Sequence, residues 1–263
     1  MNKIYNIKDN LKLYCVYHDK KLETQYIHTK HWFKSYYKPL VESDWFKLYY
    51  TKEGHINSID NLQQYFCEFT ALYYIYKNNL YSPYIGLCHY GRQKLRYLIE
   101  QNIINDTDII GEYSCNDNMK HCCEVIYNGF LIKDLLEYIK SHYDKQSRIY
   151  NYFIDNYETD VMWLSNICFI TKWEYFYEIV GLLVNFFDYI NKIKQLDWSF
   201  DKYTQFINDE WINKFDFTRC YEPNSNIWYF VSPESNKFRI IAYFIEVIIG
   251  FYFGHLKVEL SKK

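Results

Sequence analysis

The sequence contains little glycine or proline and almost no alanine. Eight glycines and four prolines are spread over 263 residues, and the only alanines are Ala71 and Ala242. The glycines form no G-x-G-x-x-G or G-x-x-x-x-G-K phosphate loop, and neither G-x-S-x-G nor H-E-x-x-H occurs. A kinase, a P-loop enzyme, an α/β-hydrolase or a zincin would need one of these motifs. No proline- or glycine-rich linker divides the chain, so we expect a single domain over 1–263.

The chain also lacks an excess of charge of either sign. Thirty Lys and Arg residues face 32 Asp and Glu residues, which gives a net charge of −2. Nucleic-acid-binding surfaces are rich in positive charge, so we expect no nucleic-acid partner. Hydrophobic residues make up 49% of the chain and charged residues 24%, which is the composition of a globular protein.

Paired C-x-x-C motifs and an apolar signal sequence are absent as well. The eight cysteines therefore favour a reduced, cytoplasmic protein, in the host cytoplasm if the source is viral. Only one group of residues has metal-ligand chemistry: Cys115, His121, Cys122 and Cys123. Because the adjacent Cys122 and Cys123 are hard to turn inward together, we do not expect a metal site there.

The first half of the chain predicts a strand, a helix and a second strand. Residues 11–18 and 84–89 are short apolar runs rich in aromatic and β-branched side chains, as strands are. Apolar residues recur at helical spacing over 62–79, which predicts one largely buried helix with Asp60 near its cap. Together these elements indicate a βαβ-like layer.

The second half of the chain is predicted to be rich in helices. We expect helices over 131–143 and 172–193 and a strand over 163–170, with Thr171 and Glu174 as a capping box. The most apolar segment, 238–254, is shorter than the ~20 residues of a membrane span. We expect a buried terminal helix there and no transmembrane segment. Peripheral membrane association through this helix is the alternative.

Polar residues follow the strand that is predicted over 84–89. In open α/β sheets ligands bind beyond the carboxyl ends of strands, so His89 and Arg92 are candidates for holding a diphosphate. The structural alternative is that one of them pairs with Glu68, which lies in the apolar helix before the strand.

Asp106 and Asp108 form a D-x-D triplet. Two carboxylates at this spacing can hold one Mg²⁺ or Mn²⁺ ion that bridges a diphosphate. A solvated turn before a strand at 108–110 is the alternative, since acidic triplets occur by chance.

The chain resembles a domain-of-unknown-function family of bacterial capsular-polysaccharide glycosyltransferases. Members open with a strand ending in His, continue with an N-x-x-Y-C-E-L-T-A-L-Y helix closed by Lys-Asn, and then read G-L-C-H-Y-R-R-Y-F. The corresponding stretches here are KLYCVYH (12–18), NLQQYFCEFTALYYIYKN (61–78) and YIGLCHYGRQ (84–93). Gly91 replaces the first of the family's paired arginines, so a phosphate-binding site here would contain one arginine fewer.

The resemblance implies an α/β fold with a GT-A-like, Rossmann-related sheet flanked by helices, and a nucleotide-sugar donor, with a UDP-sugar favoured. It implies these donor-binding residues: His18, Asn61, Glu68, His89, Tyr90 and Arg92. In that arrangement His89 and Arg92 would stand where other GT-A enzymes hold their metal.

We therefore expect a glycosyltransferase that moves a sugar to a saccharide or glycoprotein acceptor. An inverting transfer needs a carboxylate to deprotonate the acceptor hydroxyl, and Glu158 and Asp160, just before the 163–170 strand, are candidates. The alternative is a non-catalytic relative that kept the fold and binds carbohydrate or another partner. Gly91 and Gln93, which replace an arginine and a tyrosine of the family motif, favour this alternative.

Overall fold

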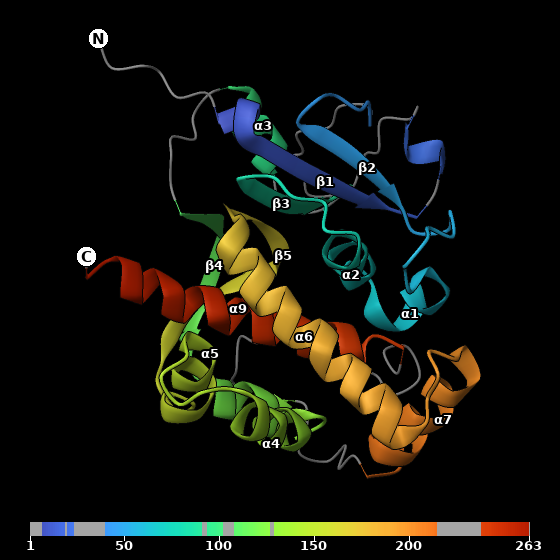
Figure 1. The fold of residues 1–263 in the computed structure, drawn as a ribbon, viewed down its shortest axis with the longest axis vertical. Coiled ribbons are helices and arrows are strands. Elements are labelled where there is room, and N and C mark those ends of the chain that lie inside the picture. The colour runs from blue at the N-terminus through green and yellow to red at the C-terminus, as the bar shows by residue number, and fades with distance from the viewer. Residues whose placement is uncertain are drawn as a thin grey trace, which may run out of the picture. The chain divides into compact units, whose positions relative to one another are not determined.

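The computed structural model describes residues 7–18, 20–23, 40–90, 94–101, 108–126, 129–214 and 238–262. The chain forms two compact units. Unit 1 comprises Met1–Gln63, Glu68–Tyr113 and Ser165–Gly181, and unit 2 comprises Gln64–Cys67, Ser114–Leu164 and Leu182–Lys263. Figure 1 shows the elements of both units along the chain.

A mixed five-stranded sheet is formed by the described strands, in the order β2-β1-β3-β5-β4. Strand β1 runs parallel to both of its neighbours, β2 and β3, whereas β3 and β5 are antiparallel. The strands are β1 (Leu11–Tyr17), β2 (Phe46–Tyr50), β3 (Tyr84–His89), β4 (Ile109–Asp117) and β5 (Val161–Lys172). The predicted α/β class and the strands at 11–18 and 84–89 are confirmed, and the strand at 163–170 is longer than predicted.

Both faces of β1 are buried, which explains its almost uninterrupted apolar sequence. On one face, Leu13 and Cys15 share a core with Leu95 of α3 (Lys94–Glu100). On the other face, the Tyr49 ring of β2 lies 5.3 Å from the Tyr74 ring of α2 (Phe69–Lys77). The sheet of unit 1 is therefore covered by a helix on each side.

The continuous helix predicted over 62–79 is wrong. The chain instead forms α1 (Gln63–Phe66) and α2, because Cys67 adopts a left-handed backbone conformation with a φ of 45°. A residue in this conformation interrupts an α-helix. Glu68 consequently stands at the start of α2, with a side chain that is 24% exposed, and not inside a buried helix.

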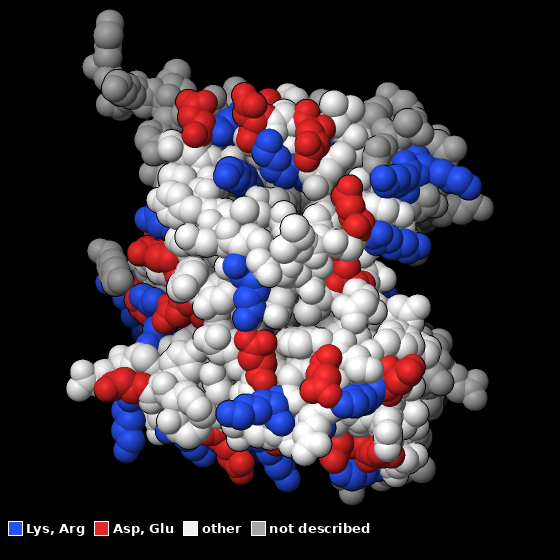
Figure 2. All heavy atoms as spheres, turned by 45° about the vertical axis from the view of Figure 1, so that its right-hand side comes forward, with Lys and Arg blue, Asp and Glu red and all other residues white. Residues whose placement is uncertain are grey.

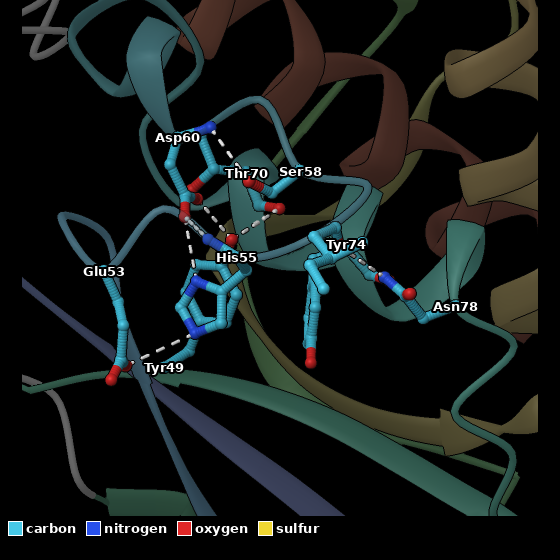
Figure 3. A network of polar contacts seen from close by, with 9 residues as sticks. Tyr49, Glu53, His55, Ser58, Asp60, Thr70, Tyr74 and Asn78 are labelled. Carbon is cyan, nitrogen blue, oxygen red and sulfur yellow. Dashed lines mark hydrogen bonds and ion pairs between the residues drawn. The ribbon is translucent and has the colours of Figure 1, made fainter.

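Asp60 does not cap that helix, because its carboxylate is engaged elsewhere (Figure 3). It accepts hydrogen bonds from the His55 backbone N–H at 3.0 Å and from the Tyr49 hydroxyl, and it lies 2.8 Å from His55 Nδ1. The His55 ring also stacks on the Tyr49 ring at 4.4 Å. Burial, followed by the Asp60 carboxylate, raises the pKa of Tyr49, so its hydroxyl stays protonated. The network ties the loop after β2 to the sheet.

The predicted capping box at Thr171 and Glu174 is also wrong. Thr171 still belongs to β5, and its hydroxyl donates to the Asp108 carbonyl at 3.0 Å. The long helix α6 (Trp173–Lys194) begins directly after the strand. The Trp173 backbone N–H donates to the Pro83 carbonyl at 3.0 Å, which fixes the start of α6 beside the start of β3.

The remaining described elements are mostly helical, as predicted for the second half of the chain. The helices are α4 (Ile132–His142), α5 (Arg148–Tyr150), α7 (Phe200–Glu210) and α9 (Ile240–Leu260). The 3₁₀ turns are η1 (Ile7–Asn10), η2 (Lys20–Glu23), η3 (Asp60–Leu62) and η6 (Ile212–Lys214), and the π-type turns are η4 (His121–Ile126) and η5 (Asn151–Asp155).

Helix α9 packs closely on the first residues of β5 in unit 2. The rings of Trp163 and Phe251 stack at 5.7 Å. A Cβ atom on Gly250 would lie 2.5 Å from the Leu164 carbonyl oxygen, so the close approach requires glycine. By length and composition α9 could cross a membrane, but 83% of its most apolar window is buried. The predicted buried terminal helix is confirmed.

Candidate ligand site at the carboxyl edge of the parallel strands

The three parallel strands of unit 1 end at the same edge of the sheet. Strand β1 ends at Tyr17, β2 ends at Tyr50 and β3 ends at His89. The register pairs Tyr17 with Tyr50 and Val16 with His89, so these ends lie side by side. The carboxyl ends of strands form the usual ligand site of an open α/β sheet.

Tyr90 lies between two imidazole rings at this edge. Its ring centroid is 3.9 Å from that of His89 and 5.0 Å from that of His18, which it meets edge to face. The Tyr90 backbone N–H donates to the Val16 carbonyl at 3.1 Å, which extends the pairing of β3 with β1 by one residue. His18 is exposed, and His89 and Tyr90 are partly exposed.

Glu68 reaches the same group of residues from the start of α2. Its Oε1 atom lies 3.8 Å from His89 Nε2, and the two side chains are 24% and 27% exposed. The alternative that His89 pairs with Glu68 is confirmed by this contact. The contact between the carboxylate and Nε2 helps to orient the imidazole ring.

Lys20 and Tyr50 add a cation and an aromatic face that the sequence did not reveal. Lys20 Nζ lies 5.1 Å from the centroid of the Tyr50 ring. The centroids of the Tyr50 and Tyr17 rings are 5.2 Å apart. These two residues were not predicted because FKLYY (46–50), which forms β2, was not recognised as a strand. We call the group of His18, Lys20, Tyr50, His89 and Tyr90 the carboxyl-edge cluster.

Thr51 follows β2 at this edge and carries a buried hydroxyl group. The residue is 1% exposed, and its Oγ1 atom has no hydrogen-bond partner among the described residues. Its backbone N–H donates to the Tyr17 carbonyl at 3.1 Å. An unpaired buried hydroxyl costs free energy, so the Thr51 hydroxyl lowers the stability of the folded protein at this edge.

Two more residues, Asn61 and Arg92, were predicted to bind the donor. Asn61 is exposed in η3, next to Asp60 and its network. Arg92 lies outside the described residues, two positions beyond Tyr90 in the sequence. The structure therefore brings together His18, His89, Tyr90 and Glu68.

The described member of the D-x-D pair lies at the opposite edge of the sheet. Asp108 forms an ion pair with Lys172, and the register places Lys172 beside Tyr84, the first residue of β3. A lysine ammonium group already satisfies this carboxylate, so its surroundings do not favour a Mg²⁺ or Mn²⁺ ligand. Asp106 lies outside the described residues.

The two candidate bases belong to unit 2. Glu158 is 68% exposed and pairs with Lys120 at 2.7 Å, and the exposed Asp160 accepts a hydrogen bond from Asn118 Nδ2 at 2.8 Å. These contacts are those of surface charges. They give no independent reason to assign either carboxylate to catalysis.

An aromatic groove of about 680 Å³ lies at the edge where β3 begins. Its walls come from the end of α2 and the start of α6, and it is lined by Tyr76, Lys77, Asn79, Trp173, Glu174 and Tyr177. Tyr177 is 47% exposed, so an aromatic face is open to solvent. The groove is thus a second polar and aromatic surface of unit 1, on the edge opposite the carboxyl-edge cluster.

Charges of both signs are mixed on one face of the molecule (Figure 2). Figure 2 shows Lys and Arg side chains interspersed with Asp and Glu side chains on the face in view. Among the described residues many of them pair, as Lys94 does with Glu112 at 2.8 Å.

The sheet, its covering helices and the polar carboxyl edge define an α/β protein with a candidate ligand site. Residues 12–207 match the family model described as a domain of unknown function (DUF4422), and the chain belongs to this family. No curated protein matches. The chain is also similar to the apo structure of WbbM, a bifunctional glycosyltransferase, with a TM-score of 0.49 and 13% identity. That alignment covers 95% of this chain and 43% of the other, so the chain spans less than half of that protein.

Proposed function

We propose that the chain is a glycosyltransferase that takes a sugar from a nucleoside-diphosphate donor bound at the carboxyl-edge cluster. The observation that carries this proposal is that two imidazoles, an ammonium group and two tyrosine rings lie at the edge where β1, β2 and β3 end. The resemblance of the 61–90 segment to capsular-polysaccharide glycosyltransferases implies the same class of reaction.

The cluster has the chemistry that a nucleotide sugar requires. His18 and Lys20 are exposed and offer donors to the diphosphate, whose negative charge grows as the bond to the sugar breaks. Glu68 contacts the His89 imidazole, which in its protonated form would also stabilise this negative charge. Arg92 would add a further cation from the adjoining segment.

The aromatic rings supply the apolar contacts of the proposed site. Tyr90 and Tyr50 are partly exposed, and their faces suit stacking against a base or a sugar ring. A uracil base is favoured by the family resemblance, and a saccharide or glycoprotein would be the acceptor. The proposal assigns no metal ion to Asp108, because this carboxylate pairs with Lys172 at the opposite edge.

Calorimetric titration of the full chain with UDP, GDP and their sugars tests the proposal. We expect one class of diphosphate to bind and Lys20→Ala or His18→Ala to weaken it at least about tenfold, since each removes a charge-assisted contact. Both residues are exposed, so the variants should remain folded. Lys77→Ala is the matched control, because this exposed lysine lies at the opposite edge.

Two results would contradict the proposal. The first is that no nucleotide or nucleotide sugar binds to the wild type. The second is binding that Lys77→Ala weakens as much as Lys20→Ala does, which would indicate an effect of net charge or binding in the groove that Lys77 lines.

The aromatic groove favours a second candidate function, a non-catalytic carbohydrate-binding protein. Trp173 and Tyr177 provide ring faces, and Lys77, Asn79 and Glu174 provide hydrogen-bonding groups around them. Saccharides are bound by this combination of stacking and polar contacts. Oligosaccharide binding that Tyr177→Ala abolishes, with no nucleotide binding to the wild type, would support this function over transfer.

A further inference from the structure

Three side chains with different ligand atoms converge at the end of β4. His121 Nδ1 lies 2.8 Å from Asp117 Oδ2, and Cys122 Sγ lies 3.3 Å from the same oxygen. One ligand atom of each residue lies within 4.8 Å of the other two. The set therefore offers one oxygen, one nitrogen and one sulfur atom to a common point.

The local backbone explains why these residues meet. Strand β4 ends at Asp117, and Asn118 Oδ1 accepts the His121 backbone N–H at 2.9 Å, so a helical turn starts at once. That turn, η4, is of the π type, a rare conformation that is frequent at functional sites. Asn118 is itself held through its Nδ2 atom by Asp160 at 2.8 Å.

The sequence-based argument against a metal site fails in the structure. Cys122 and Cys123 are 1% and 0% exposed, so both adjacent thiols point into the protein. Within the wide π-type turn both can be buried, but only Cys122 joins Asp117 and His121. Asp117 was not considered as a ligand, although it precedes His121 by four residues. Cys115 belongs to β4, and its side chain lies outside the described residues.

We propose that Asp117, His121 and Cys122 bind a zinc ion. Zinc takes carboxylate, imidazole and thiolate ligands at about 2.0 to 2.3 Å, and a tetrahedron of that size separates its ligand atoms by about 3.3 to 3.7 Å. The observed separations of 2.8 and 3.3 Å need to widen by about half an ångström or less, and the third, between His121 and Cys122, lies within 4.8 Å. The thiolate distinguishes the site from a magnesium or manganese site, for which oxygen ligands are preferred.

The three ligands are accessible enough from solvent for a metal ion to reach them. The His121 side chain is 46% exposed and that of Asp117 is 15% exposed, whereas Cys122 is buried beneath them. With three protein ligands, the fourth tetrahedral position is left to water or another ligand. The site lies in unit 2, whereas the carboxyl-edge cluster lies in unit 1, so each proposal can fail without the other.

Metal binding by the full chain, freed of metal with a chelator, tests this proposal. We expect one Zn²⁺ per chain by calorimetry, and Co²⁺ in its place should give tetrahedral d–d bands and a thiolate charge-transfer band. His121→Ala should lower the Zn²⁺ affinity by at least about tenfold. Because His121 is exposed, this variant should keep the wild-type melting temperature.

Two control variants separate the site from unspecific binding to other thiols or imidazoles. Cys123→Ser removes the neighbouring buried thiol, and His142→Ala removes an exposed histidine on α4. Both should keep stoichiometric binding, whereas Cys122→Ser should lose the charge-transfer band. A wild type that binds no Zn²⁺ would overturn the proposal, and so would binding that His121→Ala leaves unchanged.

Discussion

Acid should destabilise the protein through His255, a buried histidine of α9. The residue is 8% exposed and its ring stacks on Tyr152 at 5.1 Å. Burial lowers the pKa of His255 from 6.5 to about 4, because the charged imidazolium is poorly solvated there. Glu259, four residues further along α9, pairs with Arg148 at 3.2 Å.

The direction and size of the effect follow from the two pKa values. Between pH 6.5 and pH 4 the unfolded chain binds a proton at His255 that the folded chain does not, so stability falls as the pH falls. Linkage gives a loss of about 2 kcal/mol between pH 7 and pH 5, and about 3 kcal/mol when the titration is complete.

Urea denaturation at pH 7 and pH 5 measures this loss directly. His255→Phe removes the titrating group while keeping a ring against Tyr152, so its loss of unfolding free energy should be smaller than that of the wild type by about 2 kcal/mol. His142→Gln, at an exposed position, is the control and should behave as the wild type does. Equal losses for His255→Phe and the wild type would refute the reasoning.

Three further substitutions test the packing by urea denaturation. Gly86→Ala in β3 would place a Cβ atom 2.6 Å from the Phe169 carbonyl oxygen, and we expect a loss of about 1–3 kcal/mol; an unchanged midpoint would contradict this contact. Asn191→Ala removes a buried amide that donates to the Tyr203 hydroxyl at 2.7 Å, and it should cost at least about 2 kcal/mol. Thr51→Val replaces an unpaired buried hydroxyl by a methyl group, so the free energy of unfolding should stay the same or rise by about 1 kcal/mol. A clear loss would show that the hydroxyl has a hydrogen-bond partner.

The elements that the sequence predicted well are those whose pattern follows from burial alone. Strand β3 is buried on both faces and reads as an unbroken apolar run, and α9 is buried over most of its length. The break between α1 and α2 was missed because the apolar spacing continues across Cys67, whose left-handed backbone conformation leaves no trace in that pattern. Asp60 was taken for a cap because its partner Tyr49 is distant in sequence.

The candidate site was predictable only in part, for a similar reason. His89 ends a recognised strand, so the rule for sheet edges was enough to select it, whereas His18 and Tyr90 were grouped with it through the family resemblance. Tyr50, with Lys20 beside its ring, comes to the same edge through the parallel pairing of β1 with β2, which joins residues far apart in sequence. Likewise, Asp108 looked like a metal ligand until the antiparallel β5 brought Lys172 beside it.

A crystal structure of the chain with a bound UDP-sugar tests the central claim most directly, because unit 1 offers three distinct places for the ligand. The account predicts that the diphosphate lies within hydrogen-bonding distance of His18 and Lys20, with a ring of the ligand against Tyr90. A diphosphate bound beside Asp108 and Lys172, or in the groove lined by Trp173, would contradict it.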